Sequence, residues 1–198
     1  MGLQFTALDG RPGRTVTEPP LYERDPEAWQ AHLAEGNRTQ PRKRVGADVL
    51  FRDESGRILL VDPRYKPDWD LPGGMAEANE PPLSAAIREV REELGIEYTG
   101  GRLLVVDWVA PHGPWDDSLM FIFDGGVLTS EQQAKITLRD NELREYRFVL
   151  ENEAGGLLRS YVWLRLQCAL AARTRGTAEY LQDGTQRAAL PMPPKGFF

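Results

Sequence analysis

The chain has 198 residues, of which 41% are hydrophobic and 27% are charged, a composition that excludes disorder throughout its length. Against a prior of about 150 residues per domain, this length predicts one domain with extensions, or at most two small domains. The 30 acidic and 24 basic residues give a net charge of -6, which disfavours nucleic acid and anionic membranes as partners because both are polyanions.

Residues 1–44 are rich in proline, glycine and charge, which predicts an N-terminal extension with one short helix. Asp25 is expected to cap this helix, Pro26 to take its first position and Gly36 to end it. A basic run follows and ends at Arg44. It forms either a solvated linker or a cationic rim for an anionic substrate, so Arg44 is a candidate substrate-binding residue.

Two apolar residues of this helix, Trp29 and Leu33, are four positions apart and therefore share one face. We expect this face to pack on the main domain, in the same or in a neighbouring subunit. A homodimer is therefore an open alternative to a monomer.

The main domain is expected over residues 45–173, where strand-like and helix-like patterns predict an α+β or a layered α/β fold. Residues 130–142 are expected to form a polar loop. Residues 174–198 are expected to form a C-terminal tail with a hairpin turn at Asp183-Gly184. The expected strands are 45–51, 57–61, 103–109, 118–123 and 146–150, and the expected helices are 83–94 and 157–173.

The expected helix 83–94 has one apolar face, which should pack on a sheet. Asn79 or Glu80 is expected to cap its first turn, which lies beside two prolines. The apolar residues are spaced by four, three and four positions: Leu83, Ile87, Val90 and Leu94.

Three carboxylates, Glu89, Glu92 and Glu93, project from a separate face of this helix within about one turn. Like charges at this spacing repel, and Arg88 and Arg91 are expected to point elsewhere and to offset the repulsion only in part. A hard divalent cation resolves the conflict, because clustered carboxylates beside a backbone carbonyl are ligands that Mg²⁺ accepts. The alternative is a solvated acidic surface helix.

The full spacing of this stretch resembles the signature of the Nudix hydrolases. That signature is Gly, five residues, Glu, seven residues, then Arg-Glu-aliphatic-any-Glu-Glu-any-Gly-aliphatic. The chain matches it at Gly74, Glu80, Arg88, Glu89, Val90, Glu92, Glu93, Gly95 and Ile96. The resemblance implies a Nudix-type α/β/α sandwich with a mixed β-sheet over residues 45–173, flanked by N- and C-terminal extensions. It also implies an enzyme that hydrolyses acid anhydrides of phosphorus compounds with Mg²⁺, for which Mn²⁺ would substitute.

The resemblance further implies a role for each matching residue. Glu89, Glu92, Glu93 and the carbonyl of Gly73 would be the metal ligands. Arg88 would orient the glutamates.

The resemblance leaves the general base open. Glu89 is the first choice and Glu92 the second. Some relatives place the base or one more ligand in a later loop, for which Glu142 and Glu145 are the candidates, with Glu131 ranked below them.

The implied substrate is a nucleoside diphosphate linked to another moiety, with ADP-ribose or a nucleotide sugar favoured. Pro111, fifteen residues after Ile96, matches a proline of relatives that cleave ADP-ribose. Trp69 directly precedes the signature and is the leading candidate to stack on the base, ahead of Tyr65, Trp108 and Trp115.

Three alternatives remain for the function. One is a house-cleaning nucleoside triphosphate pyrophosphohydrolase. Another is RNA decapping, which the net acidic charge disfavours. The third is a non-catalytic ligand-binding module, a class that often loses the signature glutamates, all of which this chain keeps.

The cysteine content bears on location, because the chain has a single cysteine, Cys168. One cysteine excludes an internal disulfide framework and a cysteine-rich zinc site. No apolar run reaches the roughly 18 residues that a membrane helix needs. Together these features favour a reducing, cytoplasmic location without a membrane partner.

Overall fold

The computed structural model describes residues 18–138 and 141–186, and the chain divides into two compact units between Arg42 and Lys43. The first unit holds α1 (Leu21–Arg24) and α2 (Pro26–Thr39). In the described part of the chain, no helix combines the length and the apolar character needed to cross a membrane.

The start of α2 confirms the predicted cap, because the Asp25 side chain accepts a hydrogen bond from the backbone N–H of Ala28. The predicted end at Gly36 is wrong, since α2 continues to Thr39. An ion pair between Arg38 and Glu35 supports the last turn and helps to offset the cost of an interior glycine.

Inside this first unit, the Trp29 ring stacks on His32 with ring centroids 5.5 Å apart and meets Tyr22 edge to face. Leu33 is exposed. The docking of Trp29 and Leu33 on another surface stays a prediction.

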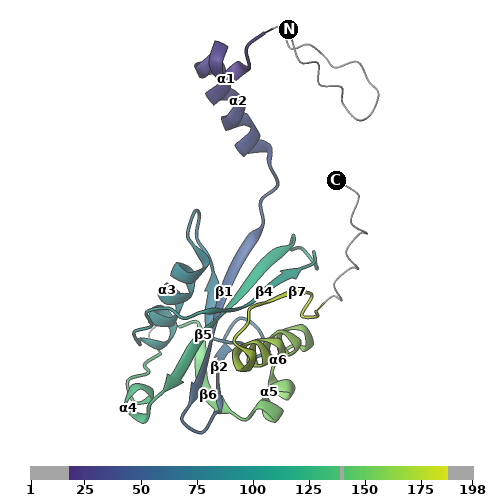
Figure 1. Ribbon diagram of the computed structural model, residues 1–198. Helices are drawn as coiled ribbons and strands as arrows, with labels where there is room; N and C mark the ends of the chain where they lie inside the picture. The colour runs from purple at the N-terminus through teal and green to yellow at the C-terminus, as the bar shows by residue number, and fades with distance from the viewer. Residues whose placement is uncertain (1–17, 139–140, 187–198) are drawn as a thin grey trace. The chain divides into compact units, whose positions relative to one another are not determined.

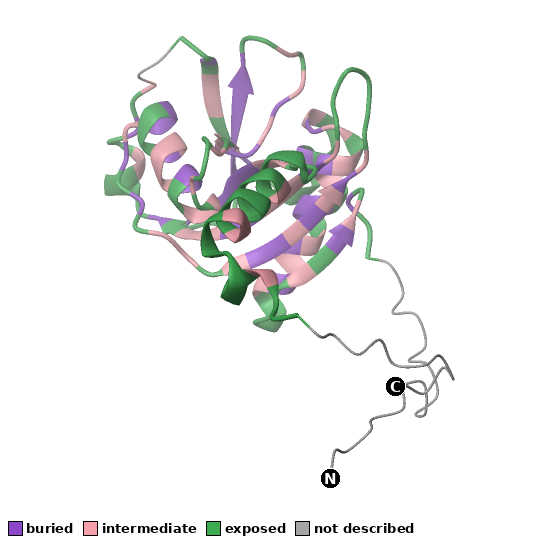
Figure 2. Cartoon of the chain, turned by 90° about the horizontal axis from the view of Figure 1, so that it is seen from above, coloured by how far each residue is buried: buried purple, intermediate pink, exposed green. Residues whose placement is uncertain are grey.

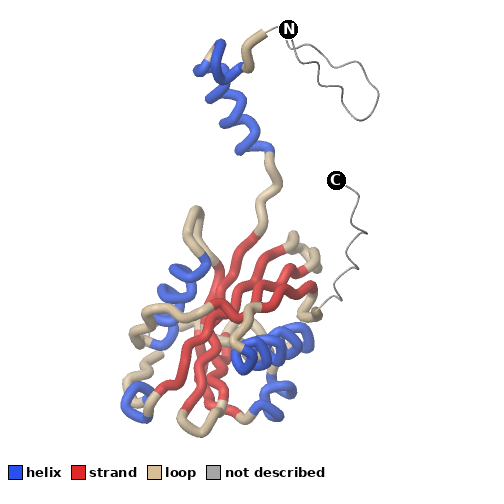
Figure 3. Tube along the Cα trace, in the orientation of Figure 1, coloured by secondary structure: helices blue, strands red, loops and turns tan. Residues whose placement is uncertain are grey.

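The second unit is built on a seven-stranded mixed sheet in the order β6-β2-β1-β5-β4-β7, with β3 paired to β1 (Figures 1 and 3). β1 runs parallel to β5 and antiparallel to β2 and β3, while β4 runs antiparallel to β5 and parallel to β7. The strands are β1 (Arg44–Asp53), β2 (Ile58–Pro63), β3 (Gly73–Met75), β4 (Leu103–Val109), β5 (Ser118–Leu128), β6 (Leu143–Val149) and β7 (Glu179–Gln182). The helices are α3 (Pro82–Leu94), α4 (Ser130–Gln133), α5 (Glu151–Leu157) and α6 (Ser160–Arg175).

Helices cover both faces of this sheet, so the expected α/β/α sandwich is confirmed (Figure 1). Because side chains alternate along a strand, Val49 and Phe51 of β1 join the core under α3, while Leu50 joins the core under α5 and α6. Figure 2 shows the buried residues concentrated along the strands between these layers. The α3 residues of the first core are Ala85, Ala86, Val90 and Leu94, and the helix residues of the second core are Ala154, Val162, Leu166 and Ala169.

The long helix expected over residues 157–173 is instead two helices, α5 and α6. Leu158 and Arg159 are extended between them. Trp69 pairs with Leu158 across this break, and Arg159 forms an ion pair with Asp68, with Nε 2.6 Å from Oδ2. Contacts distant in sequence therefore interrupt a continuous helical pattern.

Two local predictions at helix starts are also wrong. The N-cap of α3 is Pro81 and has no side-chain cap, because Glu80 binds the backbone of Glu77 and the side chain of Arg88 instead. The expected loop 130–142 contains the short helix α4, which begins with a reciprocal cap between Thr129 and Gln132.

The expected tail from residue 174 contains β7, which pairs with β4 and belongs to the sheet. The turn at Asp183-Gly184 is confirmed, with both residues at positive φ and a bridge from Gln182 to Thr185. Residues 187–198 of that tail, and residues 1–17 of the N-terminal extension, lie outside the described residues.

Candidate active site

The short strand β3 positions α3, the helix that carries Glu89, Glu92 and Glu93, against the sheet. Gly73 fixes the position of β3. Gly73 has a φ of 144°, and a Cβ there would lie 2.3 Å from the carbonyl oxygen of Ala47. Only glycine allows this approach. The N–H of Gly73 donates to Oε2 of the buried Glu93 at 2.9 Å, which ties β3 to α3.

Arg88 connects the acidic side chains of α3. Its guanidinium donates to Glu80, to Glu89 at 2.9 Å, to Glu92 at 3.1 Å and to the Met75 carbonyl. The expectation that Arg88 points away from the glutamates is therefore wrong. A single cation holds the carboxylates of Glu89 and Glu92 in place.

The electrostatics distinguish two carboxylates that contact Arg88. The hydrogen bond from Arg88 lowers the pKa of Glu80, with the Glu77 N–H as the next contribution. Burial raises the pKa of Glu89, although Arg88 opposes this shift, and the charges of Glu92 and Glu142 add to it. Burial is the main reason that the charged form of Glu89 is disfavoured, and a further cation nearby would stabilise that form.

The donor set suits a hard divalent ion, because carboxylate oxygens and a backbone carbonyl are the ligands that Mg²⁺ takes in proteins. The fit is one of chemistry and position: Glu89, Glu93 and Gly73 line one cavity together. Within residues 18–138 and 141–186, no three or more His, Cys, Asp or Glu side chains are gathered tightly enough to hold a metal ion. In this arrangement Arg88 bridges Glu89 and Glu92.

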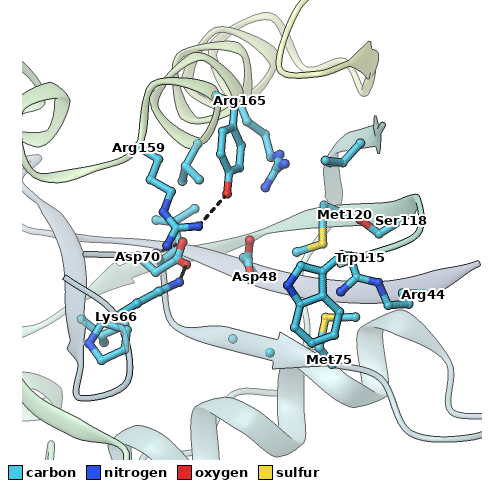
Figure 4. A pocket seen from close by; sticks show the side chains of 18 of the residues that line it. Arg44, Asp48, Lys66, Asp70, Met75, Trp115, Ser118, Met120, Arg159 and Arg165 are labelled. Atoms are coloured by element: carbon cyan, nitrogen blue, oxygen red, sulfur yellow. Dashed lines mark hydrogen bonds and ion pairs between the residues drawn. The ribbon is translucent and has the colours of Figure 1, made fainter. Parts of the chain in front are cut away.

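Two cavities meet beside β3. The larger has a volume of about 630 Å³ and is shown in Figure 4, and the smaller has a volume of about 530 Å³. Glu89 and Glu142 line the smaller cavity, whereas Arg44 and Trp115 line the larger. The residues common to both linings are Tyr65, Gly73, Gly74, Met75 and Glu93.

One side of the larger cavity is a cationic and aromatic pair. The Arg44 guanidinium lies 4.7 Å from the centroid of the Trp115 ring and donates to the backbone carbonyl of Asp116. The Trp115 side chain is 55% exposed. A planar group or a phosphate entering the cavity on this side would meet both side chains.

The opposite side carries buried charges. Asp48 lies on the same face of β1 as Leu50, and Figure 4 shows Arg165 of α6 extending toward it across the cavity. Arg165 is 2% exposed, and its Nε donates to Oδ2 of Asp107 at 2.8 Å. Its Nη2 is buried and has no hydrogen-bond partner.

Burial raises the pKa of Asp48 to about 8, and the charge of Asp70 adds to this shift. Arg165 and Lys66 oppose it. Lys66 forms an ion pair with Asp70 at the wall of the same cavity.

Trp69, the leading candidate for base stacking, lies in the core rather than at either cavity. Its side chain is 9% exposed, and the Arg147 guanidinium lies 4.9 Å from its ring centroid. Glu145 forms an ion pair with Arg147 and lines neither cavity. Of the residues considered for stacking, Tyr65 and Trp115 line the larger cavity.

Of the other candidates, Arg44 and Glu142 line the two cavities, while Glu131 is paired with Lys135 on α4. Glu92 lines neither cavity and contacts Arg88. The sequence reasoning missed five charged residues of the larger cavity: Asp48, Lys66, Asp70, Arg159 and Arg165. A signal was present for Asp48, which interrupts an apolar strand pattern, and for Arg165, which interrupts an apolar helix face.

Comparison with known proteins identifies relatives of this chain. A human protein, diphosphoinositol polyphosphate phosphohydrolase 2, is 45% identical over 64 residues, which cover 31% of this chain and 36% of that protein. The chain therefore spans about a third of the length of this curated relative.

Solved structures share the fold. A MutT protein from Methanosarcina mazei Go1 superposes with a TM-score of 0.56 and 23% identity, covering 69% of this chain and 99% of that one. A UDP-X diphosphatase superposes with a TM-score of 0.58 and 17% identity, covering 78% of this chain and 74% of that one. The NUDIX domain model matches residues 42–167, more than half of the chain, and the chain therefore belongs to the NUDIX domain family.

Proposed function

We propose that the protein is a Mg²⁺-dependent hydrolase that cleaves the phosphoanhydride of a nucleoside diphosphate linked to another moiety, with ADP-ribose or a nucleotide sugar as the favoured kind of substrate. One observation carries this proposal: the smaller cavity, which Glu89 lines, and the larger cavity share the wall at Gly73–Met75. A diphosphate lying across this wall would place its reacting phosphate beside Glu89 and Glu93, with the nucleoside in the larger cavity. Two similar proteins are named as a diphosphatase and a phosphohydrolase, which supports this reaction type.

The residues that would hold the ion are Glu89, Glu92, Glu93 and the carbonyl of Gly73. When bound, Mg²⁺ neutralises phosphate oxygens and lowers the pKa of an attacking water, and Mn²⁺ would substitute for it. The N–H of Gly73 already orients the Glu93 carboxylate at 2.9 Å, so this ligand is held in position before an ion binds.

A carboxylate next to the attacking water would accept the proton that this water loses. Glu89 is our first choice, because its half-buried carboxylate lines the smaller cavity, and Glu92 is the second. Arg88 donates to both and would hold their oxygens in place. Glu142 lines the same cavity and would serve there as a further acceptor or ligand.

The test is hydrolysis by the full chain with Mg²⁺ of a panel containing ADP-ribose, nucleotide sugars and nucleoside triphosphates, with each product identified. We expect Glu92→Gln and Glu93→Gln to lower the rate by about 100-fold or more. Glu97→Gln is the matched control, because Glu97 is an exposed glutamate that lines neither cavity. Unchanged rates in the first two variants would refute the site.

The same panel separates the alternatives. A nucleoside monophosphate with a sugar phosphate identifies the proposed reaction, whereas a nucleoside monophosphate with pyrophosphate identifies a triphosphate pyrophosphohydrolase. Binding without metal-dependent turnover on any compound identifies a non-catalytic module.

We further propose a cytoplasmic location and leave a homodimer as the alternative to a monomer. The single cysteine supports a reducing compartment: Cys168 is partly buried in α6, and burial raises the pKa of its thiol. The mass in solution of the full chain and of a chain lacking residues 1–42 would decide between the oligomeric states.

A further inference from the structure

The arginine and lysine side chains that line the larger cavity differ in whether a carboxylate balances their charge. Three of them are in ion pairs: Lys66 with Asp70, Arg159 with Asp68, and Arg165 with Asp107. Arg44 forms no ion pair within residues 18–138 and 141–186, and its guanidinium donates one hydrogen bond, to the backbone carbonyl of Asp116. Its Nε is buried and has no hydrogen-bond partner. Arg44 is therefore the arginine of this lining whose charge is not balanced.

The two aspartates next to Trp115 do not supply the missing counter-ion. Asp116 gives Arg44 its backbone carbonyl and does not line the cavity. The Asp117 carboxylate accepts hydrogen bonds from Lys43 and, at 2.8 Å, from Nε1 of Trp108, and both contacts lower its pKa. Asp117 is thus paired with a different cation, and an anion from outside the chain would be the partner of Arg44.

A serine hydroxyl lies beside Arg44 on the same face of the sheet. Arg44 of β1 and Ser118 of β5 are paired in register, so their side chains leave one face from strands about 5 Å apart. Ser118 is 4% exposed and lines the larger cavity. In the part of the chain that the structure describes, its hydroxyl makes no hydrogen bond. Because buried polar groups normally have partners, these unused donors indicate a ligand that accepts from both side chains.

The position of Arg44 along β1 separates it from the glutamates. Asp48 pairs with Gly73, and Arg44 lies four residues earlier on β1, which corresponds to about 13 Å of strand. The Arg44 guanidinium lies 4.7 Å from the centroid of the Trp115 ring, and Figure 4 shows both side chains together at one end of the cavity. The two phosphates of a diphosphate share an oxygen, so both stay near Gly73. Arg44 would therefore meet a different group of the substrate.

We propose that Arg44 and Ser118, beside the Trp115 ring, bind a phosphate monoester that the substrate carries in addition to its diphosphate. This inference rests on the proposed function, because it names a further group of the same substrate. Guanidinium N–H groups form charge-assisted hydrogen bonds to phosphate oxygens, and the serine hydroxyl adds a donor from the neighbouring strand. The Trp115 side chain, which is 55% exposed, leaves ring surface for the base or sugar that carries this phosphate.

Two parts of the substrate could carry the phosphate monoester: the ribose of the nucleoside, or the moiety on the other side of the diphosphate. Calorimetric titration of the full chain with Mg²⁺ distinguishes them. One set of probes compares adenosine 5′-monophosphate with adenosine 2′,5′-bisphosphate and adenosine 3′,5′-bisphosphate. The other set compares glucose 1-phosphate with glucose 1,6-bisphosphate.

We expect a bisphosphate to bind at least about tenfold more tightly than its monophosphate in one of the two sets, and that set identifies the moiety. Equal affinities in both sets, or no binding by any of these compounds, would overturn the inference. A preference for UDP-glucuronate over UDP-glucose without a preference for any bisphosphate would also overturn it, because the anion bound would then be a carboxylate.

Variants assign the preference to these side chains. Arg44→Met should bring the ratio of the affinities close to one, whereas Arg175→Met, the same change at an exposed position of α6 outside both cavities, should keep the wild-type ratio. Ser118→Ala should lower the ratio severalfold without lowering the melting temperature, because its hydroxyl has no partner to lose among the described residues. A wild-type ratio in Ser118→Ala and in a folded Arg44→Met protein would overturn the assignment.

The two proposals fail in different ways. Metal-dependent hydrolysis of the panel, without a preference for any bisphosphate in the titrations, leaves the proposed function standing and overturns the inference. Absence of hydrolysis of ADP-ribose, of its 2′-phosphate derivative and of the rest of the panel overturns the proposed function. The titrations and the Arg44 variant still test the phosphate site in that case.

Discussion

Gly73 is the backbone position on which the geometry of the site depends, so Gly73→Ala is a sensitive perturbation. Its φ of 144° lies in a region that alanine rarely adopts, and the added Cβ would be 2.3 Å from the Ala47 oxygen and 2.6 Å from the Asp48 Cα. Ordinary contacts between such atoms need about 3.5 Å, so β3 must move by about 1 Å. That movement also strains the hydrogen bond from Gly73 to Glu93.

The cost combines two effects. Backbone strain contributes about 1–3 kcal/mol, and the weakened hydrogen bond to a charged carboxylate contributes about 1.5–3 kcal/mol. At about 2–4 °C per kcal/mol for a chain of this size, the variant should melt roughly 5–25 °C below the wild type. Differential scanning calorimetry measures this shift, and the hydrolysis rate should fall with it.

The matched control is the neighbouring change Gly74→Ala. A Cβ at Gly74 meets Oε1 of Glu89 at 2.5 Å, and that atom is the end of a side chain that can rotate. We expect the melting temperature to stay within about 2 °C while the hydrolysis rate falls, because the Glu89 carboxylate is displaced. A Gly73→Ala protein that melts within about 2 °C of the wild type would show that the contact with Ala47 does not hold β3 in place.

The other predictions concern the pH dependence of stability, the contact of Trp115 with substrate, and the role of Glu142 in proton transfer or metal binding. Arg144 donates two hydrogen bonds to Asp62 and lowers its pKa, so Asp62→Asn should lower the free energy of unfolding by about 1–3 kcal/mol at pH 7 in urea titrations. A lowered folded pKa gives stability above the unfolded value of about 3.9 that is lost as pH falls, so the two proteins should converge in acid. Trp115→Ala should raise KM without changing the melting temperature, whereas Trp69→Ala should cost about 3–5 kcal/mol of stability. Glu142→Gln should lower kcat by about tenfold or more.

Contrary results at Asp62, Trp115 or Glu142 would contradict these predictions separately. A stability difference between wild type and Asp62→Asn that stays constant from pH 7 to pH 3 would contradict the pKa argument. An unchanged KM in Trp115→Ala would place the substrate elsewhere. Glu145→Gln is the control for Glu142, because Glu145 is paired with Arg147 outside both cavities, and it should leave kcat unchanged.

Short-range patterns in the sequence predicted most of the sandwich. Strand-like apolar runs next to turn residues predicted strands that the structure has as β1, β2 and β4, and the spacing of Val90 and Leu94 predicted the buried face of α3. Both depend on residues that are near one another in the chain, so a local stretch of sequence contains the information. The grouping of Glu89, Glu92 and Glu93 on one face of α3 could be predicted for the same reason, because the three residues lie within five positions of the chain.

The substrate end of the site depended on contacts between segments far apart in the chain. Trp69 precedes the signature and is therefore expected from the sequence to stack on the base. Its pairing with Leu158 and the packing around it place it in the core instead. Arg165 reaches the cavity because Asp107, 58 residues earlier, holds its guanidinium, and β7 enters the sheet by pairing with β4. Periodicity shows which face of an element is buried, but not which other element packs against that face. The charged wall of the larger cavity that holds Asp48 and Arg165 therefore forms only when α6, β1 and β4 are assembled.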